Sequence, residues 1–176
     1  GMDHIAFLLA LLLLSRNLRD VIFMVTGFTV GHSITLTLAA LGWVEPNVEV
    51  IEALIGFTIA IVAAETVALR AGASRSIATL GAVILLGLAA FSVWLGVGPP
   101  VRVLLGLALF SFCYLRLAEN PEVAMRLSPL LTVLFGLIHG FGFANVLIEI
   151  GLPAGRLVPA LFGFNVGVEL GQLAIV

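Results

Sequence analysis

The chain has 176 residues, of which 61% are hydrophobic and only 10% are charged. A soluble globular domain carries about 25% charged residues, and a fold of this size cannot hide so much apolar surface from water. The net charge of −2 comes with no basic tract, and the mean hydropathy is +1.24. The composition therefore excludes soluble enzymes, disordered proteins and nucleic-acid-binding proteins, and it places the chain in a lipid bilayer.

Long apolar runs alternate with short polar breaks along the chain. Only helices and closed barrels satisfy the backbone polar groups in lipid, and the runs lack the alternation of barrel strands. The sequence therefore predicts an all-α polytopic membrane bundle that forms one domain, with about seven transmembrane helices over residues 2–14, 21–43, 48–69, 77–97, 101–117, 129–150 and 157–176. The first run is too short to span a bilayer. We interpret it as the later part of a helix that starts upstream, although a Gly-Met tag remnant is the alternative.

The arginines indicate an orientation. Six of the eight basic residues lie within or close beside the first, third and fifth breaks, and the other two lie at the edges of the remaining breaks. Cytoplasmic loops carry an excess of positive residues, so this pattern predicts that the N-terminal side of the chain lies outside.

Five ionisable residues converge on the middle of the bilayer. At a rise of about 1.5 Å per residue, His4, His32, His139 and Glu169 fall near one depth, with Asp3 beside the first of them. A single intramembrane histidine can simply bond a neighbouring helix, but intramembrane carboxylates cost roughly 2.5–3.5 kcal/mol each and are functional candidates by default. Imidazole and carboxylate ligands suit Ni, Zn, Co or Cu rather than Mg or Ca. The sequence therefore predicts a metal site made by these five residues.

Other polar residues predict a path to and from this site. Glu52 and Glu149 lie about one turn inside the outer helix ends, and Glu65 lies about one turn from an inner end. Weak, repeated acidic sites are what a cation path needs. The residues expected along the path or around the metal ligands are Ser33, Glu52, Glu65, Asn145, Glu149, Asn165 and Gln172.

Small and hydroxyl-bearing residues form stripes on three of the runs. The second run carries a polar stripe that can serve interhelical hydrogen bonding or pore lining, and both alternatives stay open: Thr26, Thr29, Ser33 and Thr37. The last run has glycines at four-residue spacing, Gly163, Gly167 and Gly171, and the sixth run has Gly136 and Gly140. Such glycines predict faces for close helix packing, with Asn165, Glu169 and Gln172 on the opposite face of the last run.

Four blocks of the sequence, in order, resemble the signatures of the HupE/UreJ family: residues 1–13, 28–36, 135–144 and 161–172. The resemblance implies a permease of the bacterial inner membrane that supplies nickel, sometimes cobalt, to hydrogenase or urease. The family's His-x5-Asp-His motif would place its last two residues at Asp3 and His4, and its first histidine upstream of Gly1. The helical pair at 77–117 looks like an addition to the compact family pattern.

The leading hypothesis is therefore a permease for a divalent transition metal, with nickel first, and with cobalt, zinc and copper also compatible. Its partners are the ion and the lipid bilayer, with no nucleic acid, and a homo-oligomer is compatible with the sequence. Transport should weaken as the pH falls through the usual histidine pKa of about 6.5, because only neutral imidazole binds metal.

Two alternatives use the same histidines, so the sequence leaves open whether the protein is an enzyme. One is an intramembrane zinc hydrolase, and the other is a haem-binding membrane protein. A shared ion site also requires that the runs at 2–14, 21–43, 129–150 and 157–176 are neighbours. The pair at 77–117 is then expected at the periphery, against lipid or a second protomer.

Overall fold

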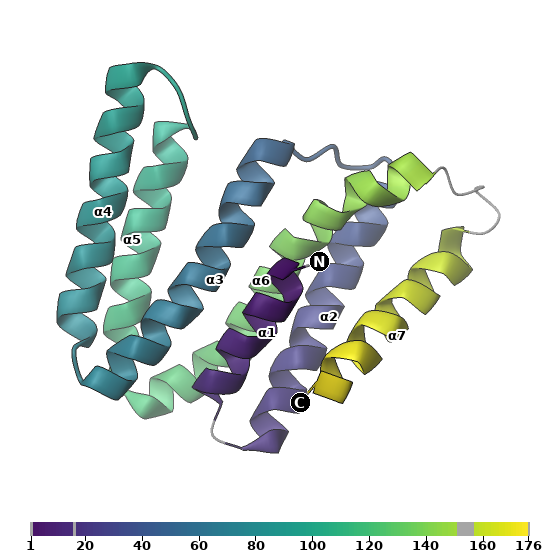
Figure 1. Cartoon of the computed structure of the whole chain (residues 1–176), viewed down its shortest axis with the longest axis horizontal. Helices are drawn as coiled ribbons and strands as arrows, with labels where there is room; N and C mark the ends of the chain where they lie inside the picture. The colour runs from purple at the N-terminus through teal and green to yellow at the C-terminus, as the bar shows by residue number, and fades with distance from the viewer. Residues whose placement is uncertain (1, 16, 151–156, 176) are drawn as a thin grey trace. The chain divides into compact units, whose positions relative to one another are not determined.

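The computed structural model describes the backbone of residues 2–15, 17–150 and 157–175, and their side chains except those of 2, 121, 125, 144–150, 157 and 175. All regular structure in this part is helical, which confirms the all-α prediction. The helices in chain order (Figure 1) are α1 (Met2–Leu14), α2 (Leu18–Ala40), α3 (Val48–Ala71), α4 (Ser74–Leu95), α5 (Val101–Leu117), α6 (Pro121–Ile150) and α7 (Leu157–Ile175).

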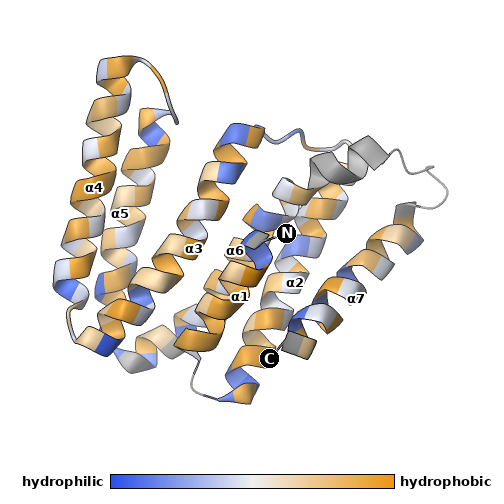
Figure 2. Cartoon of the chain, viewed as in Figure 1, coloured by the Kyte–Doolittle hydropathy of each residue, from blue (hydrophilic) through white to orange (hydrophobic). Residues whose placement is uncertain are grey.

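The helices have the surface of a membrane protein. Within the described residues, four stretches are long and apolar enough to cross a bilayer: Leu18–Ala40, Val48–Ala71, Ser74–Leu95 and Glu122–Phe143. Figure 2 shows hydrophobic residues along most of every helix. Large apolar side chains are widely exposed, including Trp94 at 79% and Leu109 at 66%. A water-soluble protein rarely exposes such a continuous apolar surface, whereas a bilayer requires one.

The start of α6 differs from the prediction, which placed it at Pro129. The helix begins at Pro121, and the side-chain oxygen of Asn120 accepts a hydrogen bond of 3.0 Å from the backbone N–H of Glu122. Asn before Pro, with an acidic residue in the first turn, is a strong helix start. Pro129 is accommodated inside the helix, as prolines of transmembrane helices often are.

The break between α3 and α4 is shorter than the expected stretch of residues 70–76. Only Gly72 and Ala73 separate the two helices. Gly72 has a φ of +60°, and the N–H of Ala73 bonds the carbonyl of Ala68 at 3.1 Å. Glycine adopts this left-handed conformation without the cost that a side chain would add, so α3 ends abruptly there.

The chain forms two compact units, Gly1–Ile59 with Leu127–Val176, and Ala60–Arg126. The first unit contains α1, α2, α7, the beginning of α3 and most of α6. In the second unit α4 and α5 pack against each other as a helical hairpin (Figure 1). The expected single domain and the peripheral place of this hairpin stay predictions.

In the first unit, α2 and α6 approach each other through glycines. A Cβ atom added at Gly31 would overlap the backbone of Val133, and one added at Gly136 would overlap the carbonyl of Phe28. A Cβ at Gly140 would overlap the backbone oxygen of His32 and the side-chain oxygen of Thr35. The predicted packing role of Gly136 and Gly140 is therefore confirmed, and it brings His32 and His139 onto neighbouring helices.

The glycines of α7 behave differently. A Cβ added at Gly163, Gly167 or Gly171 would meet no atom within 4 Å among the described residues. The opposite, polar face of α7 contacts α2 instead, where α2 and α7 lie side by side (Figure 1). The prediction of a packed glycine face on α7 is therefore wrong for contacts within this part of the chain. The spacing of the glycines identified a face of small residues on α7, but it could not show whether another helix packs against that face.

Candidate metal centre

The three histidines lie against one another inside the first unit. His4 comes from α1, His32 from α2 and His139 from α6. The ring centroid of His4 lies 5.4 Å from that of His32 and 5.3 Å from that of His139. The side chains of His32 and His139 are fully buried, and His4 is partly buried. Two imidazoles bound to one ion through bonds of about 2.0–2.1 Å have ring centroids roughly 5 Å apart, so this spacing suits a shared ion.

One ring nitrogen of each histidine is buried without a hydrogen-bond partner among the described residues. These atoms are Nε2 of His4, Nε2 of His32 and Nδ1 of His139. A buried polar atom left unpaired costs about 1–3 kcal/mol, and native proteins leave few of them. Three such nitrogens on adjacent rings are the main chemical feature of the unit, and a bound cation would satisfy them.

The opposite nitrogens of the two fully buried histidines do have partners. Nδ1 of His32 lies 3.3 Å from Oδ1 of Asn165 on α7, and Nε2 of His139 lies 2.8 Å from the hydroxyl of Thr58 on α3. Asn165 was expected near the site, whereas Thr58 was not. A single threonine in an apolar run does not indicate a histidine partner, because the hydroxyl of a helical threonine can equally bond a backbone carbonyl of its own helix.

Phenylalanines surround the imidazoles. Phe28 and Phe143 each lie with their ring centroids 5.4–5.6 Å from that of His4, and Phe7 lies 5.2 Å from His139. Phe164 stacks on His32 at 6.1 Å. The side chains of His32 and His139 are fully shielded from solvent, and the absence of water strengthens electrostatic interactions around them. None of these phenylalanines was predicted from the sequence, although a signal existed, since three of them lie three or four positions from a histidine on the same helix face.

The two predicted carboxylate ligands lie away from the rings. The side chain of Asp3 is exposed, and adjacent helical residues such as Asp3 and His4 point about 100° apart. Glu169 is partly buried, and its Oε1 accepts a hydrogen bond of 2.9 Å from the hydroxyl of Thr26. The structure thus groups the three histidines and leaves both carboxylates outside that group.

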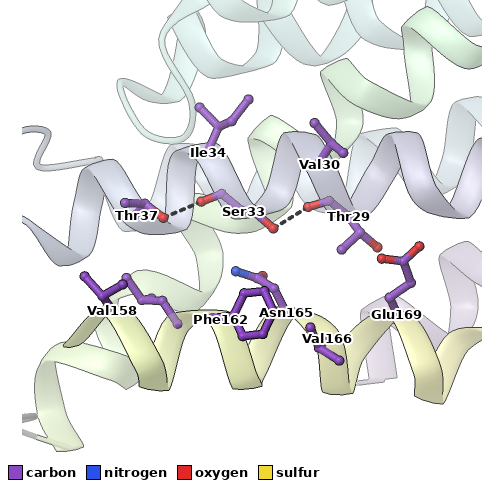
Figure 3. A pocket seen from close by; sticks show the side chains of 11 residues that line it. Thr29, Val30, Ser33, Ile34, Thr37, Val158, Phe162, Asn165, Val166 and Glu169 are labelled. Carbon is purple, nitrogen blue, oxygen red and sulfur yellow. Dashed lines mark hydrogen bonds between the residues drawn. The ribbon is translucent and has the colours of Figure 1, made fainter. Parts of the chain in front are cut away.

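Glu169 instead faces a groove between α2 and α7. The groove has a volume of about 490 Å³, and its polar lining includes Ser33, Asn165 and Glu169. Figure 3 shows the hydroxyl of Ser33 bonded to the carbonyl of Thr29, and the Asn165 side chain directed into the space between the helices. Because Asn165 also bonds His32, one residue connects the groove with the histidine cluster.

The remaining predicted residues are dispersed. Gln172 is buried and lies 3.5 Å from the hydroxyl of Thr29. Glu52 is exposed. The side chains of Asn145 and Glu149 lie outside the described residues.

Glu65 belongs to the second unit. It is 1% exposed, and its Oε2 accepts a hydrogen bond of 2.5 Å from the hydroxyl of Tyr114. Its other carboxyl oxygen has no partner among the described residues. Glu65 is therefore a buried intramembrane carboxyl with one named partner, a feature that usually indicates function.

The family comparison covers the whole chain. It matches the HupE / UreJ protein family over residues 1–104 and 76–176. The chain belongs to the HupE/UreJ family. No curated protein and no solved structure matches the chain significantly. Membership of HupE/UreJ, together with the apolar helices, identifies a membrane protein related to nickel and cobalt transporters.

In this HupE/UreJ protein, the described residues contain no group of three or more His, Cys, Asp or Glu side chains already arranged to hold a metal. The His4 ring meets the other two edge to face, at interplanar angles of 78° and 88°. An ion between the rings therefore requires the imidazoles to turn toward a common point. The arrangement can offer three nitrogen ligands on three helices, with no carboxylate among them.

Proposed function

We propose that this HupE/UreJ protein is an inner-membrane permease that moves a divalent transition metal ion, nickel first and cobalt second, through the cluster of His4, His32 and His139. The observation that carries the proposal is the set of three buried imidazole nitrogens on adjacent rings that have no hydrogen-bond partner among the described residues. Nitrogen ligands favour nickel, cobalt, zinc and copper over magnesium and calcium. Among these ions, nickel and cobalt are the ones associated with the family's transporter-like proteins.

The groove between α2 and α7 is the proposed route of the ion to the cluster. Among the described residues that line the groove, only Glu169 carries a carboxylate, and this charge attracts a cation into the groove beside the neutral imidazoles. Asn165 lies one helical turn from Glu169 and contacts His32. A route of this kind uses successive weak sites, which allow an ion both to bind and to leave. The predictions that Glu52 and Glu149 serve entry and that Glu65 serves exit stay untested.

Nickel uptake into vesicles tests this function. The purified protein is placed in liposomes that contain a nickel-sensitive dye, and external nickel is added. The wild-type protein is expected to load the vesicles, and His32→Ala is expected to do so no faster than protein-free liposomes. Normal uptake by His32→Ala, in vesicles with equal amounts of protein, would remove the histidine cluster from the transport route.

Glu169→Gln is expected to slow the same uptake by roughly tenfold or more at low nickel and low salt, because charge that lines a cleft raises the capture rate by about 10–10³-fold. The difference should shrink at saturating nickel. Glu49→Gln is the matched control, since Glu49 is an exposed residue in the first turn of α3. Equal uptake rates of Glu169→Gln and Glu49→Gln at low nickel would argue against the groove as the route.

The two alternatives have weaker support. Two histidines that hold a haem lie on opposite faces of a flat macrocycle, whereas these imidazoles contact one another and four phenylalanines. A zinc hydrolase needs a general base within hydrogen-bond reach of the metal-bound water, and Glu169 bonds Thr26 instead. A Soret band, or zinc that survives chelation, would favour these alternatives.

A further inference from the structure

We propose that Thr58 and Asn165 are positioning residues that hold His139 and His32 in opposite tautomers, so that each ring directs a lone pair at the same ion. This inference rests on the metal site proposed above and extends it to two residues that do not touch the ion. Each of the two residues bonds one ring nitrogen of its histidine, and the other ring nitrogen has no partner in the part of the chain that the structure describes.

Asn165 determines the tautomer of His32. The atom of Asn165 that lies 3.3 Å from Nδ1 of His32 is the amide oxygen Oδ1, which can only accept a hydrogen bond. Nδ1 of His32 therefore carries the proton. In a neutral imidazole the other nitrogen then holds the lone pair, and this nitrogen is the buried, unpartnered Nε2.

Thr58 determines the tautomer of His139 by a longer chain of bonds. The Thr58 hydroxyl has one proton, and it donates that proton to the backbone carbonyl of Ile55 at 2.7 Å. Toward Nε2 of His139, 2.8 Å away, the hydroxyl can then only accept. Nε2 of His139 therefore carries the proton, and the lone pair falls on the buried, unpartnered Nδ1.

The opposite tautomers have a consequence for the site. A swapped proton would direct an N–H group at the cation and remove that histidine as a ligand. The close contacts at Gly31 and Gly136 fix the spacing of α2 and α6. A shift of either backbone therefore cannot compensate for a histidine in the wrong tautomer. Hydrogen-bond partners on the far nitrogen of ligating histidines commonly contribute 10–100-fold to metal affinity.

The test compares nickel affinity among threonine variants of the full chain in detergent. Thr58→Val keeps the shape of the side chain but removes the hydroxyl, and it is expected to weaken nickel binding roughly 10–100-fold. Thr58→Ser restores the hydroxyl and is expected to regain most of the affinity. Thr66→Val is the matched control, because Thr66 is also buried on α3, and among the described residues its hydroxyl bonds only the carbonyl of Val62, at 3.0 Å. Its affinity should equal that of the wild type.

Nitrogen-15 NMR of the imidazoles supplies a readout that a general loss of stability would not change. In the metal-free wild type, the His139 signal should show the proton on Nε2, and the His32 signal should show it on Nδ1. Thr58→Val should give mixed tautomers at His139 alone, and Asn165→Leu should do so at His32 alone. Unchanged tautomers together with unchanged affinity in Thr58→Val would overturn the inference. His139→Ala separates the two proposals, because wild-type affinity in that variant would instead refute the metal site itself.

Discussion

His139→Ala is expected to accumulate in the membrane like the wild type and to bind nickel more than roughly 100-fold more weakly, a larger loss than an outer hydrogen-bond partner causes. The substitution removes one of three nitrogen ligands. It also removes a buried, unpaired nitrogen, and the Thr58 hydroxyl keeps its bond to the Ile55 carbonyl. The metal-free fold should therefore lose less stability than a buried substitution usually costs.

Thermal unfolding in detergent, with and without nickel, measures both parts of this prediction. A ligand that binds only the folded state raises its stability, by about 2.7 kcal/mol at a concentration 100 times Kd. Nickel should raise the Tm of the wild type and leave that of His139→Ala unchanged. Thr132→Val is the control, because Thr132 is buried on the same helix and its one hydrogen bond to a described residue goes to the Pro129 carbonyl, at 2.9 Å. An equal nickel-induced rise in His139→Ala and Thr132→Val would refute the role of His139.

Gly136→Ala is expected to have the largest effect on folding. Its added methyl group would overlap the carbonyl of Phe28, and a backbone atom yields less readily than the end of a flexible side chain. Overpacking of this kind typically costs about 1–3 kcal/mol, and here it also forces α2 away from α6. The yield of folded protein, its Tm and its nickel affinity should all fall.

Gly167→Ala separates this steric effect from a general effect of replacing a helical glycine. Gly167 has open space around it among the described residues, and alanine favours a helix by about 1 kcal/mol over glycine. Size-exclusion profiles and Tm values of both variants in detergent make the comparison. An equal loss in the two variants, or no loss in Gly136→Ala, would contradict the close approach of α2 and α6.

The sequence predicted the helical architecture well because its strongest signal, long apolar runs, depends on the bilayer and not on tertiary contacts. Counting residues along the runs also identified the three histidines, which the structure groups together. The same counting also grouped Glu169 with the histidines, whereas in the structure Glu169 lies outside the histidine cluster. A shared depth says nothing about the direction of a side chain, and Glu169 faces Thr26 and the groove.

Other features depend on neighbours that a single sequence does not reveal. The spacing of glycines on α6 and α7 is similar, yet within the described residues only those on α6 meet another helix. In the sequence Thr58 looks the same as Thr66, and only the folded structure shows that Thr58 lies beside His139. By contrast, the early start of α6 could have been found, since Asn120, Pro121 and Glu122 form a helix start that the hydropathy boundary at Pro129 obscured.

X-ray absorption spectroscopy of the nickel-loaded protein tests the central claim, that three imidazoles share one ion. The account predicts a first shell of nitrogen or oxygen atoms near 2.0–2.1 Å, together with the outer-shell scattering of about three imidazole rings. The imidazole signal should fall by one ring in His4→Ala, in His32→Ala and in His139→Ala. A nickel ion surrounded only by oxygen ligands, with a spectrum that none of these substitutions changes, would contradict the account.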